Sequence, residues 1–156
     1  MTRLKEVNVS IEVGQDAPDF TLQNQNREEV TLSELRGTPV VLVFYPFDFS
    51  GVCTAEHCEI RDDYKGWIEQ GAEIFGISRD SIFAHQAFKE QESLPYSLLS
   101  DMKGEVAQLY GTWNAAVAVA ERLTVVIDRE GKVAYMTRSG ALPEARDHSE
   151  VLSHLS

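Results

Sequence analysis

The order of apolar and polar residues along the chain predicts alternating strands and helices. Val40 to Tyr45 is a continuous apolar run rich in β-branched residues, as expected of a central strand covered on both faces. From Cys53 to Gln70, apolar residues recur at helical spacing, and Gly71 follows as a helix end. The predicted inward positions of this helix are Ile60, Tyr64, Trp67 and Ile68. Glu73 to Ser78 is the next strand, so the three segments form a βαβ unit with parallel strands.

Further elements are predicted on both sides of this unit. Before it, we expect a small N-terminal hairpin (Asp16 to Leu22 with Val30 to Leu32) and one helical turn (Ser33 to Gly37). After it, we expect a helix from Ser81 to Gln91 with Ile82, Phe83 and Phe88 inward, a strand from Tyr96 to Leu99 and a short helix from Gly104 to Tyr110. The chain then forms a hairpin of Leu123 to Ile127 with Val133 to Thr137, and a closing helix from Pro143 to Leu155 that buries Val151, Leu152 and Leu155. Their order predicts an α/β fold: a central mixed β-sheet with helices on both faces.

Length and charge narrow the class of protein. A chain of 156 residues with 43% hydrophobic residues can form one well-packed core, so we expect a single domain over residues 1–156. The net charge of -11 argues against nucleic acid and against an anionic membrane surface as partners, since both would repel the protein. No segment approaches the roughly 18 apolar residues of a membrane span, and the N-terminus has no export signal. We therefore expect a cytoplasmic protein.

The stretch from Tyr45 to Glu56 carries the candidate chemistry, because a cysteine lies there where a strand passes into a helix. Pro46 ends the strand, Ser50 is a good N-cap, and Cys53 then falls at the third helical position. In that first turn, the unpaired N–H groups and the positive end of the helix dipole favour a thiolate. Cys53 is the candidate nucleophile.

Other chemistry-bearing residues have simpler interpretations on their own. Cys58 could pack on the inner face of the helix, Glu56 could be a surface acid, and Arg122 could mark the boundary of the strand that follows it. His57 with the two cysteines does not supply the four ligands of structural zinc, and a single helical histidine is usually solvated, so we expect no metal and no cofactor. The apolar segment formed by Trp113 and residues 115–120 could be core or a homodimer contact.

Several motifs together resemble the peroxiredoxins. Pro46, Ser50 and Cys53 match the pattern P-x-x-x-(T/S)-x-x-C, and Thr54 and Glu56 continue it as C-T-x-E. An arginine ahead of a core strand, as in RLTVVID, is the second motif of that family. The resemblance extends over nearly the whole chain, from GQDAPDFTL through VVLVFYP, FGIS, LLSD and YGTW to IDREGKV. It implies a thioredoxin-like fold and a thiol-dependent peroxidase acting on hydroperoxides.

The resemblance also implies a role for each site residue. Cys53 would be the peroxidatic cysteine, Arg122 would hold the thiolate and the peroxide, and Ser50 would bind the peroxide oxygens. Pro46 would shield the site, and Glu56 would orient the arginine. Cys53-x-x-x-x-Cys58 resembles the bacterioferritin-comigratory or Q-type branch, in which the second cysteine forms an intramolecular disulfide that thioredoxin or another thiol donor reduces.

Three alternatives stay open at this point. FDFSGVC is similar to the AhpE-like branch, and a one-cysteine peroxidase would be reduced by an external thiol. A thioredoxin-like disulfide reductase would require a C-x-x-C pair, which the chain lacks. An interaction module that keeps its cysteines only for packing would consume no peroxide.

Overall fold

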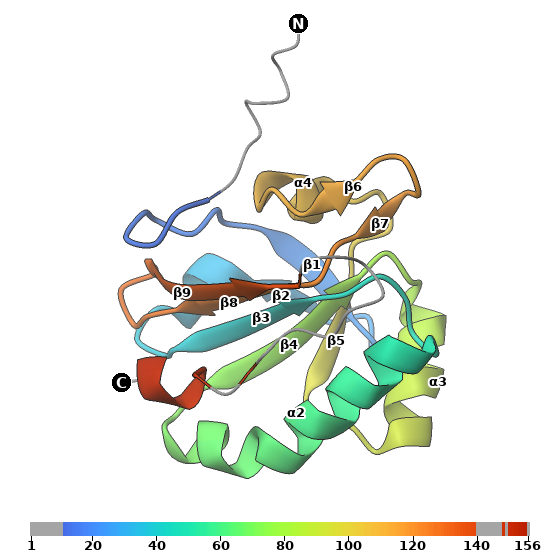
Figure 1. Ribbon diagram of the computed structural model, residues 1–156, viewed down its shortest axis with the longest axis horizontal. Coiled ribbons are helices and arrows are strands. Elements are labelled where there is room, and N and C mark those ends of the chain that lie inside the picture. Colours follow the sequence, from blue (N-terminus) through green and yellow to red (C-terminus); the bar gives the residue numbers. More distant parts are fainter. Residues whose placement is uncertain (1–10, 140–147, 149, 156) are drawn as a thin grey trace, which may run out of the picture.

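The computed structural model describes residues 11–139, 148 and 150–155, and its centre is a seven-stranded mixed sheet (Figure 1). The strand order is β2-β1-β5-β4-β3-β8-β9. The bounds are β1 (Thr21–Asn24), β2 (Glu29–Thr31), β3 (Val40–Phe44), β4 (Glu73–Ser78), β5 (Ser97–Ser100), β8 (Leu123–Ile127) and β9 (Val133–Arg138). Strand β4 pairs in parallel with both β3 and β5, whereas β8 pairs antiparallel with β3. The predicted βαβ unit and the β8–β9 hairpin are confirmed.

Helices and irregular segments cover both faces of this sheet. Two long helices, α2 (Gly51–Glu69) and α3 (Ile82–Glu92), lie below the sheet in the view of Figure 1, and the short α4 (Glu105–Leu109) lies above it. A small second sheet of β6 (Trp113–Asn114) and β7 (Val119–Ala120) lies beside α4. Two 3-10 turns, η1 (Leu32–Leu35) and η2 (Leu152–His154), complete the described elements. Among the described residues, no helix has the length and apolar character that crossing a membrane would require.

The core consists of two layers divided by β3, whose five residues are all buried. Val41 and Val43 face Ile60 and Trp67 of α2, whereas Leu42 and Phe44 face the opposite layer with Tyr110. Because successive side chains of a strand point to opposite faces, a strand that is apolar at every position must be covered on both sides. The prediction for this strand is therefore confirmed, and with it the placement of helices on both faces.

Two inward positions predicted for the helices are wrong. Ile68 is 39% exposed and Phe83 is 64% exposed. On α2, Ile68 lies about 80° around the axis from Ile60, at the edge of the buried stripe. On α3, Phe83 lies about 140° from the buried Phe88 and faces outward. Its ring instead has the guanidinium of Arg27 above it, 5.4 Å from the ring centroid.

The chain ends differ from the prediction in extent. The N-terminal hairpin begins later than expected, with Leu22 paired to Val30. Residues 143–147 and 149 of the predicted helix from Pro143 to Leu155 lie outside the described residues, and its described part contains only the short η2. There Val151 and Leu155 are buried as predicted, whereas Leu152 is exposed.

Candidate active site

The candidate site forms where β3 ends and α2 begins. Ser50 has extended backbone angles, and its Oγ accepts a hydrogen bond from the backbone N–H of Cys53 at 3.3 Å. This is the N-cap geometry that the sequence predicts, and it places Cys53 in the first turn of α2. At the other end of α2, Gly71 has a φ of 85° and closes the helix as expected.

Arg122 reaches this site because of the sheet register. It directly precedes β8, whose first residue, Leu123, pairs with Phe44 at the end of β3. The start of β8 therefore lies beside the start of α2, although Arg122 and Cys53 are 69 positions apart in the chain. The guanidinium of Arg122 therefore extends from the start of β8 to the first turn of α2, which follows β3.

One nitrogen of Arg122 contacts both acidic groups of the site. Nη1 donates to Cys53 Sγ at 3.1 Å and to Glu56 Oε1 at 3.0 Å. Cys53, Glu56 and Arg122 are 0%, 1% and 4% exposed, so these contacts are shielded from water. The interpretation of Glu56 as a surface acid is wrong, because its carboxylate forms a buried ion pair with Arg122. Charge-assisted contacts of this kind are stronger than neutral ones and fix the position of the sulfur.

The loop between β3 and α2 is held by a buried polar network that the sequence analysis missed. Asp48 accepts from Tyr45 Oη at 2.5 Å and lies 2.7 Å from Nδ1 of His85. Nε2 of His85 lies 3.0 Å from the carbonyl of Leu99, so it must be the donor there. Burial, with the nearby Asp48 carboxylate, holds the pKa of Tyr45 well above its usual range, so the phenol stays a donor. Pro46, on the same loop, is buried.

Within the part of the chain that the structure describes, the histidines and cysteines do not come together as a group that could hold a metal ion. His57 is buried rather than solvated, contrary to the expectation, and its Nδ1 lies 2.5 Å from the hydroxyl of Tyr96. Its ring packs edge-on against Tyr45 at a centroid distance of 4.3 Å. Donor atoms of Asp48, Asp80 and His85 do lie within 4.8 Å of one another. Those of Asp48 and His85 are hydrogen-bonded together, which accounts for their proximity without an ion.

Cys58 lies in the second turn of α2, apart from the contacts of Cys53. It is half-buried, and its Sγ lies 3.5 Å from Glu92 Oε1 at the end of α3. Burial and the hydrogen bond to Glu92 raise the pKa of the Cys58 thiol. Both cysteines are free thiols within one continuous helix.

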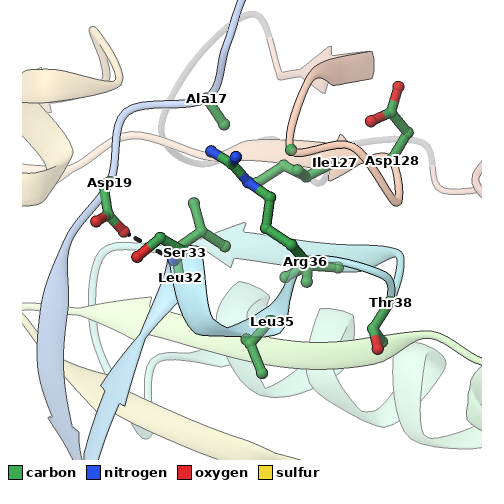
Figure 2. Close-up of a pocket in the computed structure, with 11 residues that line it drawn as sticks. Ala17, Asp19, Leu32, Ser33, Leu35, Arg36, Thr38, Ile127 and Asp128 are labelled. Atoms are coloured by element: carbon green, nitrogen blue, oxygen red, sulfur yellow. Dashed lines mark hydrogen bonds between the residues drawn. The ribbon is translucent and has the colours of Figure 1, made fainter.

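A pocket elsewhere in the protein is not part of this site. It lies at the opposite end of β3, beside Val40, and at the opposite end of β8, beside Ile127. Figure 2 shows the Arg36 side chain extending across it, with Asp19 hydrogen-bonded to the backbone N–H of Ser33 at its margin. Its volume of 10 Å³ is about that of one water molecule, too small for a substrate.

Comparison with known proteins assigns the family. The family model described as "AhpC/TSA family" matches residues 13–136, and the chain belongs to this family. A "Putative peroxiredoxin bcp" of Coxiella burnetii is 41% identical over 131 residues, which cover 80% of this chain and 87% of that protein. "Peroxiredoxin Q, chloroplastic" of Oryza sativa subsp. japonica is 39% identical over 84% of this chain, but the match spans only 61% of that longer protein.

A solved structure agrees with these relatives. The crystal structure of "Peroxidoxin BcpB from Mycobacterium tuberculosis" has a TM-score of 0.85 at 33% identity and covers 93% of this chain and 96% of its own. The peroxiredoxin resemblance and the thioredoxin-like α/β fold are thereby confirmed. The similarity to Bcp and Q-type proteins favours that branch of the two that the sequence motifs suggest.

Proposed function

We propose that the protein is a thiol-dependent peroxidase that reduces hydrogen peroxide and organic hydroperoxides through Cys53. The Cys53 thiolate attacks the distal oxygen of the hydroperoxide, and the O–O bond breaks as the S–O bond forms. The leaving oxygen takes up the proton that the thiol had released, so the products are a Cys53 sulfenic acid and water or an alcohol. The observation that supports this most is the buried guanidinium of Arg122, 3.1 Å from Sγ. A fixed cation there stabilises the thiolate and the charge that moves onto the leaving oxygen.

Four neighbours have proposed roles around this sulfur. Arg122 holds the thiolate and the peroxide, and Glu56 orients Arg122 through their 3.0 Å contact. Ser50, whose Oγ lies 3.3 Å from the backbone nitrogen of Cys53, provides a hydroxyl near the reacting atoms. Pro46, buried in the loop before it, shields the sulfur from water. The catalytic set is therefore Cys53, Ser50, Arg122, Pro46 and Glu56, with Cys58 acting in the next step.

In that next step, Cys58 attacks the sulfenic acid and forms an intramolecular disulfide with loss of water. On an intact helix, residues five apart have Cα atoms about 8.6 Å apart, whereas disulfides need about 4.4–6.8 Å. Since both cysteines lie within α2, its first turns must unwind before the bond can form. Thioredoxin or another thiol donor then reduces the disulfide, which gives a cycle that requires no cofactor.

Cysteine variants and mass mapping test this function. Cys53→Ser should abolish peroxide consumption, and Cys58→Ser should complete one fast turnover and then stall. Peptide mapping of the peroxide-treated protein should find a Cys53–Cys58 crosslink. Wild-type activity in Cys53→Ser would overturn the assignment of Cys53. An oxidised protein that contains only Cys53 sulfenic acid or a mixed disulfide would instead favour the one-cysteine mechanism.

The assembly and setting of the enzyme are also part of the proposal. We place it in the cytoplasm as a single domain over residues 1–156. A homodimer contact is supported by Val117, which is 53% exposed at the turn between β6 and β7. Val119 and Ala120 in the same segment are buried and belong to the core.

A further inference from the structure

Cys58 lies on α2, the helix that also carries Cys53, but its thiol contacts the neighbouring helix α3. Its Sγ donates to Oε1 of Glu92, the last residue of α3, at 3.5 Å. Gln91 Nε2 lies 3.2 Å from the other carboxylate oxygen, and Arg61 Nη1 donates to the Glu92 carbonyl at 2.6 Å. The second and third turns of α2 are thus joined to the end of α3, by Cys58 through the Glu92 side chain and by Arg61 through the Glu92 backbone.

This contact has a consequence for the protonation state of Cys58. An ionised carboxylate accepts hydrogen bonds but cannot donate them, so the contact exists only while Cys58 carries its proton. Burial comes first and the Glu92 hydrogen bond second among the causes that raise the pKa of Cys58. The negative charges of Glu92 and Asp62 act in the same direction, and the Arg61 guanidinium acts against them. Disulfide formation needs the opposite state, because the attacking group is the thiolate.

We propose that Glu92 is a positioning residue that retains Cys58 as a protonated thiol on the folded helix and thereby slows its attack on the oxidised Cys53. The inference rests on the proposed function, in which Cys58 resolves the sulfenic acid. In that step the S–H bond of Cys58 and the S–O bond of Cys53 break and the S–S bond forms. The hydroxide that leaves combines with the proton as water, and no further reductant is consumed. Loss of the Glu92 contact must precede this reaction, together with the unwinding of α2.

Glu92→Gln tests this by removing the charge while keeping the length of the side chain. Glu90→Gln is the matched control, because Glu90 is an exposed acid on the same helix whose side chain has no described contact with Cys58. One equivalent of hydrogen peroxide is mixed with reduced protein, the reaction is quenched at intervals, and mass spectrometry separates Cys53 sulfenic acid from the disulfide. The formation of sulfenic acid should keep the wild-type rate in both variants. Its conversion to disulfide should be about two- to tenfold faster in Glu92→Gln, because the neutral amide no longer opposes ionisation of the thiol and its N–H can donate to the thiolate, an effect about the size of one hydrogen bond.

A pH profile distinguishes this role from a merely structural one. In a Cys53→Ser background, the rate of Cys58 alkylation by iodoacetamide against pH reports the pKa of the Cys58 thiol. Glu92→Gln should move this profile to lower pH, and Glu90→Gln should leave it in place.

The possible outcomes separate the two proposals. Disulfide formation at an unchanged or slower rate in Glu92→Gln would overturn the role of Glu92 while leaving Cys58 as the resolving cysteine. An alkylation profile that does not move would overturn it as well. If neither wild type nor Glu92→Gln forms a disulfide after a normal first step, both this role and the resolving role of Cys58 fail, although the peroxidase activity of Cys53 stands.

Discussion

Replacing Arg122 with lysine retains a positive charge near Cys53 but shortens the side chain that carries it. The donor Nη1 lies 3.1 Å from Cys53 Sγ and 3.0 Å from Glu56 Oε1. A lysine side chain is one bond shorter, so its nitrogen falls about 1.3 Å short of that position. The contact with sulfur then lengthens from 3.1 Å to about 4.4 Å, beyond hydrogen-bonding distance. Lysine also lacks the planar fork that allows a guanidinium to hold two groups at fixed angles.

The expected effect on rate follows from the lost contact. A hydrogen bond to a charged group contributes about 1.5–3 kcal/mol, and each 1.36 kcal/mol of transition-state stabilisation is tenfold in rate. Arg122→Lys should therefore slow the oxidation of Cys53 by about ten- to a hundredfold. Arg122→Lys should also be more stable than Arg122→Met, which removes the positive charge from the buried ion pair with Glu56 at a cost of about 3–5 kcal/mol.

Stopped-flow mixing with hydrogen peroxide measures the rate, and urea unfolding measures the stability. Arg138→Lys is the control, because Arg138 is an exposed arginine whose ion pair with Glu121 spans 4.0 Å. That variant should oxidise at the wild-type rate. If Arg122→Lys also stays within about twofold of wild type while fully folded, Arg122 is not part of the reacting group.

Two further predictions concern packing and assembly. Gly76→Ala should lower the free energy of unfolding by about 1–3 kcal/mol, since its Cβ would lie 2.7 Å from Leu98 Cδ2 and 3.1 Å from His57 Cε1. The control Gly66→Ala, whose Cβ would meet open space, should not destabilise the protein. Equal urea midpoints for the two variants would contradict this prediction. Sedimentation at increasing protein concentration should detect a homodimer, and Val117→Asp should weaken it; a monomer at the highest concentration would contradict the dimer.

The strand, loop and helix around Cys53 were predictable because each step has a local signal. Pro46, Ser50 and Gly71 specify where the strand ends and where the helix begins and ends, and the structure has those bounds within a residue or two. The family motif added Arg122, whose proximity depends on β8 pairing with β3. Nothing local to Arg122 distinguishes a strand boundary from a buried ligand of a thiolate, so periodicity alone did not place it.

The remaining site features depend on contacts between distant segments. Asp48 and His85 are 37 positions apart, and Cys58 and Glu92 are 34 apart, so no spacing rule connects them. His57 follows a polar residue on a helix and has the local signals of a surface histidine. It is buried because its ring Nδ1 is hydrogen-bonded to the hydroxyl of Tyr96 and Tyr45 packs against its ring.

These distant contacts also determine how far α2 can unwind. Ile60 and Trp67 anchor the later part of the helix in the core, so unwinding that stops before Ile60 leaves that layer intact. Cys58 lies on the near side of this anchor, and Ser50 and Arg122 hold the first turn by contacts made around Cys53 itself. Oxidation of Cys53 changes the very sulfur to which Arg122 donates, so the chemistry acts directly on the contacts that retain the first turn. What then resists unwinding is the buried ion pair of Glu56 with Arg122 and the buried side chain of His57, together with the Cys58 contact to α3. In the proposed cycle, the rate of the second step therefore depends on His57, Cys58 and Glu92, which take no part in the first step, as well as on the Glu56–Arg122 ion pair.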